Sequence, residues 1–243
     1  EYVLDGELNV KEFFNISDIS EAVADEYLKV PTRIAQAKQM LEGGEPERDF
    51  GEYCHKPYGC TFWEYCSRDI IPHPSVFDLY RMSFKKALEH MNEGRLTLEN
   101  MREEKLTDTQ QLQLECTLGD KTYINKDGIK EFLTQLSYPL YFLDFETEQT
   151  VIPKYQGTHP YQQVTFQYSI HYIEQEGGEL KHTEFLGDGV TDPRRALAEQ
   201  LCHDIPMNVC TTAYNKAFEC TRLKELAEAY PDLAPHLINI KEH

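Results

Sequence analysis

Two acidic residues close an apolar run in the stretch YPLYFLDFETE at residues 138–148. The run predicts a strand over 139–146, apolar enough for the middle of a sheet. Side chains alternate along a strand, so Asp144 and Glu146 share a face and project side by side. Adjacent carboxylates repel one another unless a cation lies between them, so this spacing indicates a metal site.

A third acid follows in the run TAYNKAFE at residues 212–219. If a helix begins around Lys216, directly after Asn215, then Glu219 lies in its first turn and faces back toward the edge of the sheet. Clustered carboxylates favour Mg²⁺ or Mn²⁺, which keep positions open for water and phosphate. Two such ions about 3.5–4 Å apart can activate water and stabilise the leaving oxygen of a phosphodiester. We therefore expect Asp144, Glu146 and Glu219 to be catalytic metal ligands, and Asn215 to contact the substrate.

The segment PKYQGTHPYQQVTFQYSIH, at residues 153–171, is rich in Tyr, Gln and His. It could line a nucleic-acid groove in which Tyr161 or Tyr155 stacks on a base. In that groove Gln162, Gln163 or Gln167 would bond to sugar or phosphate. The alternation of apolar and polar residues in the same segment is equally typical of a half-buried strand, and both interpretations stay open.

Three cysteines recur at intervals of six in CHKPYGCTFWEYC, namely Cys54, Cys60 and Cys66. Thiolates bind zinc or iron–sulfur clusters, so either is expected here. His55 could be the fourth ligand of zinc, whereas a [4Fe-4S] cluster would need another cysteine. The alternative is three buried thiols packed among aromatic side chains. The remaining cysteines are interpreted as core residues: Cys116, Cys202, Cys210 and Cys220.

The composition limits the partners. The 243 residues include 42 acids and 24 bases, a formal charge of -18, which excludes general electrostatic capture of nucleic acid. A phosphate-bearing partner would need a metal ion or a local basic patch. No signal peptide is evident, and no apolar run approaches the roughly 18 residues that span a bilayer, so a cytoplasmic protein without membrane partners is expected. The chain begins with Glu and reads as a piece of a longer protein.

The N-terminal half is predicted to be mostly helical. A short hairpin or the end of a strand, with a turn at Asp5-Gly6, is expected over residues 1–10. A helix from Ser17 or Asp18 should kink at Pro31 and end at Gly43-Gly44. Further helices are predicted over 75–92 and 107–116.

From about residue 121 the pattern alternates between strands and helices. A short strand at 122–125 and a helix at 126–136 precede the strand at 139–146. Two strands at 163–175 and 179–186 form a hairpin around Gly177-Gly178. A helix at 192–203, a strand at 208–215 beside the first strand, and a helix at 217–229 complete the order, which is that of the ribonuclease H-like fold.

The motifs carry a more specific resemblance. DFE at 144–146 resembles the first motif, Asp-x-Glu, of the DEDD proofreading-type exonucleases, and NKAFE at 215–219 is similar to their second motif, with Glu in place of Asp. Together with CHKPYGCTFWEYC, FLDFET, YNKAFE and the segment at 153–171, these residues resemble, over nearly the whole chain, a bacterial family called domain of unknown function 2779.

The resemblance implies an α/β (α+β) protein of two domains. Residues 1–120 would be the α-rich remnant of a PD-(D/E)XK nuclease domain. The cysteine segment is similar to the C-terminal cysteine set of the iron–sulfur members of that class, which implies a [4Fe-4S] cluster, with zinc as the alternative. Residues 121–243 would be a C-terminally truncated ribonuclease H-like domain of the DEDD type.

The implied activity is metal-dependent hydrolysis of phosphodiester bonds in DNA or RNA, in the manner of a 3′–5′ exonuclease. Asp144 would bridge both metal ions, Glu146 would hold the ion that carries the attacking water, and Glu219 would help to hold the other. The third motif, Tyr-x3-Asp or His-x4-Asp, is not found after 219 and would be expected beyond His243. The alternative is a non-catalytic nucleic-acid-binding or assembly module with a degenerate site. Oligomeric state is left open.

Overall fold

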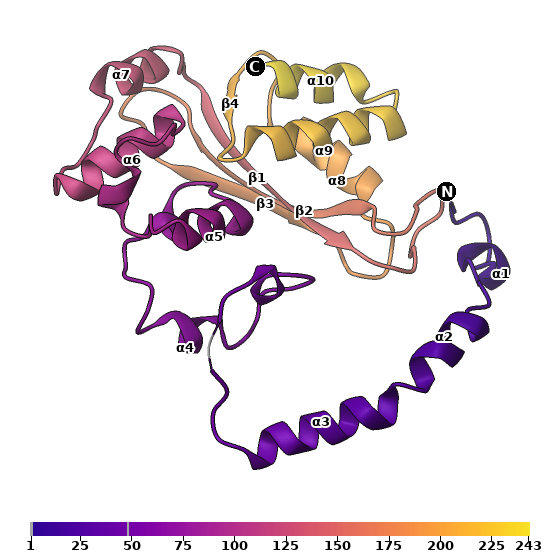
Figure 1. The fold of residues 1–243 in the computed structure, drawn as a ribbon. Helices are drawn as coiled ribbons and strands as arrows, with labels where there is room; N and C mark the ends of the chain where they lie inside the picture. The colour runs from indigo at the N-terminus through magenta and orange to yellow at the C-terminus, as the bar shows by residue number, and fades with distance from the viewer. Residues whose placement is uncertain (1, 48) are drawn as a thin grey trace. The chain divides into compact units, whose positions relative to one another are not determined.

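The structure is a computed structural model that describes residues 2–47 and 49–243 (Figure 1). Its contacts divide the chain into two units. One unit comprises the N-terminal segment up to Ser17 together with Lys126–His243, and the other comprises Asp18–Asn125. The predicted mixed α/β class is confirmed. No helix of the described residues is both long and apolar enough to cross a membrane.

The first unit is built on one mixed sheet with the strand order β3-β2-β1-β4. Its strands are β1 (Leu140–Gln149), β2 (Gln163–Ile173), β3 (Lys181–Leu186) and β4 (Cys210–Thr212). The strands β1, β2 and β3 form an antiparallel meander, and β4 pairs with β1 in parallel. The predicted topology is therefore confirmed, although β4 is only three residues long.

A register shift interrupts the ladder between β1 and β2. Glu146 lies opposite Gln167, but the next residue, Thr147, lies opposite Thr165, so Phe166 has no partner in β1. The extra residue makes this a β-bulge, a feature that changes the twist of a strand and the direction of its side chains.

One face of the sheet is buried against helices α8 (Arg194–Asp204), α9 (Lys216–Ala229) and α10 (Ala234–Glu242) (Figure 1). On the sheet this core is formed by the inward residues of β1 and β2, which are Tyr141, Leu143, Phe145, Tyr168 and Ile170. Fully burying side chains of this size contributes about 1.5–3 kcal/mol each. The alternation along 141–145 thus fixes which residues face the solvent.

The helix α10 was not predicted. It carries Pro235 in its first turn, where a missing N–H costs nothing. Leu237 and Ile240 lie one turn apart and are 0% and 3% exposed, so α10 belongs to the main core.

Two predictions near the unit boundary are wrong. Residues 2–6 form no hairpin; instead the N–H of Leu4 donates to Thr158 O at 2.9 Å and the N–H of Gly157 donates to Leu4 O at 2.8 Å. The backbone N–H and C=O of Leu4 are therefore bonded to residues 157–158, which are distant in sequence. The short helix α1 (Val10–Phe13) follows this segment. Residues 122–125 form no strand and lead directly into α7 (Lys126–Thr134).

The second unit is helical. Its elements are α2 (Ser20–Tyr27), α3 (Val30–Glu42), η1 (Glu52–Cys54), α4 (Trp63–Ser67), η2 (Val76–Asp78), α5 (Phe84–Asn92), η3 (Leu98–Met101) and α6 (Asp108–Leu118). The predicted kinked helix is two helices, with Pro31 in the first turn of α3 and Gly43 at its C-cap. The core of the second unit is formed by Val76, Leu79, Ala87, Leu98, Met101 and Leu114.

The helix predicted over 75–92 is wrong in its first half. Ser75 caps only the 3₁₀ turn η2, through a reciprocal pair of hydrogen bonds with Asp78. A second serine, Ser83, accepts from the backbone N–H of Lys86 and begins α5. Two capping serines eight residues apart therefore divide a segment that reads as one amphipathic helix.

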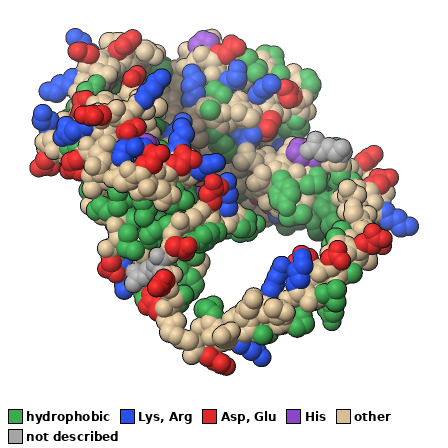
Figure 2. Space-filling view, viewed as in Figure 1, with side chains coloured by type: hydrophobic (Ala, Val, Ile, Leu, Met, Phe, Trp, Pro, Cys, Tyr) green, Lys and Arg blue, Asp and Glu red, His purple; other side chains and the backbone are tan. Residues whose placement is uncertain are grey.

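Every residue of α2 and α3 is exposed. Figure 2 shows hydrophobic side chains along their surface. Ile19, Val23 and Tyr27 follow the predicted helical spacing, but they pack into no core of the described residues. The apolar periodicity therefore predicted helical structure correctly, but it did not show which surface these helices would pack against.

Candidate active site

Asp144 and Glu146 lie on the solvent face of β1, as predicted. Their neighbours Leu143 and Phe145 are each 3% exposed and point to the core. The pairing with β4 ends at Phe142, so from Leu143 onward that edge of β1 has no strand beside it among the described residues. The two acids are thus held by a rigid strand at an open edge.

Glu219 lies in the first turn of α9, which begins at Lys216 after the N-cap Asn215, as predicted. Glu219 is only 5% exposed, and its Oε2 atom has no hydrogen-bond partner within the described residues. Burial raises the pKa of Glu219, and the negative charge of Asp144 raises it further. A buried polar atom without a partner costs on the order of 1–3 kcal/mol, so this position is unfavourable unless another group binds there.

The charge of Asp144 on β1 acts on Glu219 of α9, although the two residues lie on elements far apart in the chain. Like charges repel, and a cation is the group that relieves such repulsion. However, in the described part of the chain no three or more His, Cys, Asp or Glu side chains are gathered closely enough to hold one ion. The carboxylate donors suit a hard divalent cation, and two of the three predicted ligands interact electrostatically.

Polar residues of β2 and β3 extend this face of the sheet. Ser169 lies opposite Asp144, and Glu184 of β3 lies opposite Ser169. Gln167 lies opposite Glu146, so the predicted substrate-binding residue is next to a predicted ligand. Ser169 and Glu184 were not singled out from the sequence, although the alternation of the hairpin strands predicts that they share the face of Gln167.

Asn215 is exposed at the start of α9. Its side chain makes no capping hydrogen bond, while its carbonyl accepts from the N–H of Phe218 at 2.8 Å. The side-chain amide is therefore not used to cap the helix, which leaves the predicted contact with substrate sterically open.

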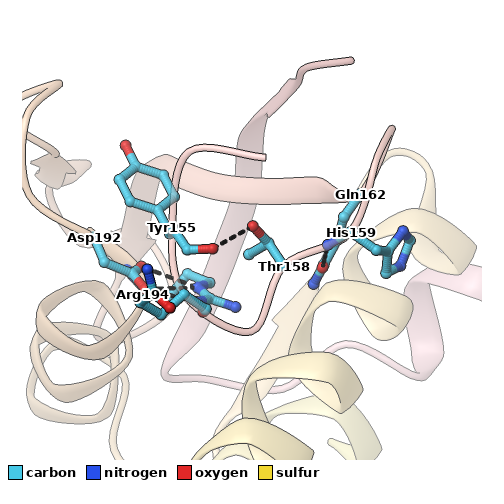
Figure 3. A network of polar contacts seen from close by, with 7 residues as sticks. Tyr155, Thr158, His159, Gln162, Asp192 and Arg194 are labelled. Atoms are coloured by element: carbon cyan, nitrogen blue, oxygen red, sulfur yellow. Dashed lines mark hydrogen bonds and ion pairs between the residues drawn. The ribbon is translucent and has the colours of Figure 1, made fainter. Parts of the chain in front are cut away.

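The loop after β1 holds the other predicted substrate contacts (Figure 3). The carbonyl of the Gln162 side chain accepts from the N–H of His159 at 3.1 Å, so it is used within the loop. Tyr161 is 59% exposed, so its ring is accessible to solvent. Tyr155 is 8% exposed, which argues against base stacking, and burial is the first cause of its raised pKa. Gln163 begins β2 and is half-buried.

An ion pair anchors this loop. The guanidinium of Arg194 donates to Asp192 at 2.6 Å and to Gln156 O at 3.1 Å (Figure 3). The Asp192 hydrogen bond raises the pKa of Arg194. The first turn of α8 therefore fixes the loop that connects β1 with β2.

The three clustered cysteines line one cavity of about 680 Å³ in the second unit, with Cys54 in η1, Cys66 in α4 and Cys60 between them. The N–H of Cys60 donates to Cys54 O at 2.9 Å. Hydrogen bonding to Asp49 raises the pKa of Tyr53 to about 12, with smaller contributions from Cys54 and Cys66. Thiols at an apolar wall suit zinc or an iron–sulfur cluster. Among the described residues, however, the three thiols are not close enough together to hold one metal ion.

Comparison with known proteins gives a family match over the C-terminal part of the chain. Residues 141–243 match the model of a family described as a domain of unknown function (DUF2779). This match supports the resemblance to that family over the part of the chain that carries Asp144, Glu146 and Glu219. No curated protein and no solved structure matches the chain.

Proposed function

We propose that the first unit binds a divalent cation between Asp144 and Glu219 and, with Glu146, hydrolyses phosphodiester bonds of DNA or RNA. The observation that carries this proposal is the buried Oε2 of Glu219, which has no hydrogen-bond partner among residues 2–47 and 49–243 and is influenced by the charge of Asp144. A structural acid in a first helical turn would face the solvent, where the macrodipole stabilises it at no desolvation cost.

Each acid has a distinct part in this proposal. Glu219 supplies a dehydrated oxygen, and Asp144 supplies an oxygen from the rigid strand. Glu146, on the same face, is placed to orient water or to hold a second ion beside Gln167. Bound Mg²⁺ or Mn²⁺ would supply the polarisation of water and of the leaving oxygen.

Cation binding also fits the charge of the molecule. A net charge of -18 repels a polyanion. A cation between Asp144 and Glu219 neutralises the acids at the one place where a phosphate would have to approach. Nucleic-acid binding is therefore expected to need the divalent ion.

The rival proposal is a non-catalytic nucleic-acid-binding or assembly module. It is favoured by the finding that no three potential ligands of the described residues are gathered around one point. The nucleic-acid-binding form of the rival predicts binding without hydrolysis, the assembly form predicts neither, and only the first proposal predicts hydrolysis.

The experiment uses the 243-residue chain and end-labelled single-stranded DNA and RNA with Mg²⁺, Mn²⁺ or EDTA. Asp144→Asn and Glu219→Gln should each reduce cleavage at least about 100-fold, the scale of a lost charge-stabilising group. Glu228→Gln, an exposed acid of the same helix, is the matched control. Cleavage that survives Asp144→Asn would refute the hydrolase proposal, and metal-dependent binding without cleavage would favour the rival.

For the cysteine cavity we propose a structural [4Fe-4S] cluster or zinc ion held by Cys54, Cys60 and Cys66. The supporting observation is that all three thiols line the same apolar cavity, although they come from separate turns. A residue other than these three cysteines would have to be the remaining ligand. For zinc, His55 is a neighbouring donor.

A further inference from the structure

Two histidines lie side by side on the solvent face of the sheet. His171 of β2 is directly opposite His182 of β3, and the centroids of their rings are 4.5 Å apart with an angle of 36° between the planes. Both are exposed. They are therefore accessible to a ligand and held by neighbouring strands, which limits the freedom of their backbones.

The surroundings of this histidine pair are polar. The Nε2 atom of His182 lies 3.1 Å from Ser169 Oγ and 3.9 Å from Glu184 Oε2. Glu184 therefore offers a carboxylate oxygen near the imidazoles. The ladder position of Ser169 also places the pair two residues along β2 from the position opposite Asp144.

We propose that His171 and His182 bind a transition-metal ion such as Zn²⁺, Ni²⁺ or Cu²⁺. Imidazole nitrogen suits these ions, whereas Mg²⁺ prefers oxygen. With metal–nitrogen distances of about 2.0–2.1 Å and tetrahedral geometry, two imidazole centroids would lie about 5 Å apart. The observed 4.5 Å is close to that value, so the spacing of the two rings is compatible with a shared ion.

The ligand count sets the character of this site. Since no group of three or more potential ligands is gathered in residues 2–47 and 49–243, two imidazoles would hold the ion and water would fill the other positions. Those open positions face the same side of the sheet as Asp144 and Glu146. An exchangeable ion that accepts a phosphate or carboxylate group is thus expected, distinct from the carboxylate site.

The test separates this site from the cysteines by a residue-resolved measurement. The 243-residue chain is treated with diethyl pyrocarbonate with and without Zn²⁺ or Ni²⁺, and modification of each histidine is measured by mass spectrometry. Zinc should protect His171 and His182. His203, whose side chain is 80% exposed on α8, is the internal control and should remain reactive.

Matched variants complete the test. His171→Asn with His182→Gln should remove one equivalent of bound Zn²⁺, and each single variant should weaken binding at this site at least about tenfold. His203→Gln should change neither, and thermal unfolding without metal checks that the variants fold. Equal protection of all three histidines, or unchanged stoichiometry in the double variant, would overturn the proposal. Asp144→Asn should keep this site, so its failure and that of the hydrolase proposal are distinguishable.

Discussion

Burial, and then the negative charge of Asp144 on β1, raise the pKa of Glu219 in the first turn of α9, although the two acids are far apart in the chain. The two acids differ in burial, because Asp144 is exposed on the face of a strand whereas Glu219 is only 5% exposed. The buried member therefore bears most of the electrostatic consequence, and measurements on Glu219 report the state of Asp144.

Removing the charge of Asp144 should lower the pKa of Glu219. Asp144→Asn abolishes the like-charge interaction, but burial, the larger cause, keeps the pKa above its ordinary value. Carboxyl NMR titration of wild type and Asp144→Asn measures the change, with Glu228→Gln as control. An unchanged Glu219 pKa in Asp144→Asn would mean that the two carboxylates do not interact.

The contribution of Glu219 to the stability of the protein should fall as pH rises, whereas the contribution of a salt-bridged acid rises with pH. The folded-state pKa of Glu219 is raised, so its contribution is most favourable at low pH and is lost as pH rises through the raised pKa. Relative to wild type, Glu219→Gln should therefore gain stability from acidic to neutral pH. Urea unfolding across this pH range measures the difference, and a constant difference would contradict it.

Divalent cations should stabilise the wild type more than Glu219→Gln. Mn²⁺ that binds only the folded wild type raises its stability by mass action, about 2.7 kcal/mol at a hundredfold excess over Kd. Glu219→Gln should gain little, because the buried oxygen is then part of a neutral amide. Thermal unfolding with increasing Mn²⁺ is the measurement, and equal shifts in both proteins would place the ion elsewhere.

The helix α10 should be an integral part of the core. Leu237 is 0% exposed, so Leu237→Ala should cost about 2–5 kcal/mol in the free energy of unfolding. Leu180→Ala, at a side chain 58% exposed, should change it by less than about 0.5 kcal/mol. Similar small effects in both variants would show that α10 frays from the sheet.

Metal content should distinguish the two forms of the cysteine site. Protein purified without oxygen should contain either iron with a brown colour and absorption near about 400 nm, or zinc, the two ions that thiolate sets of this kind bind. Cys60→Ser should remove most of the bound metal, and Cys116→Ser, in α6 outside the cavity, should not. Neither metal in the wild type would leave three thiols packed among aromatic rings.

Local patterns in the sequence predicted much of the sheet and the start of α9. The alternation over 140–146 fixed which face Asp144 shares with Glu146, because burial of Leu143 and Phe145 leaves no other register. The helix assumed to begin around Lys216 does begin there, so Glu219 lies in its first turn as expected.

Features that depend on distant partners were not predictable in this way. The backbone of Leu4 pairs with the loop at 157–158, and no signal within residues 1–10 could reveal that partner. The side-chain carbonyl of Gln162 is used by its own loop, a role that composition does not distinguish from substrate binding. Burial of Glu219 likewise results from tertiary packing, whereas its position in the helix is local.

The unpaired Phe166 divides its own strand, β2, into two frames of side-chain alternation, whereas β1 carries no inserted residue. Gln167 and Ser169, opposite Glu146 and Asp144, belong to one frame, and Val164, opposite Glu148, belongs to the other. Acids two residues apart on β1 therefore meet different neighbours, because Glu146 has the polar Gln167 opposite it and Glu148 has the buried Val164. Deleting Phe166 would join the two frames and change the partner of every β1 residue on one side of the bulge.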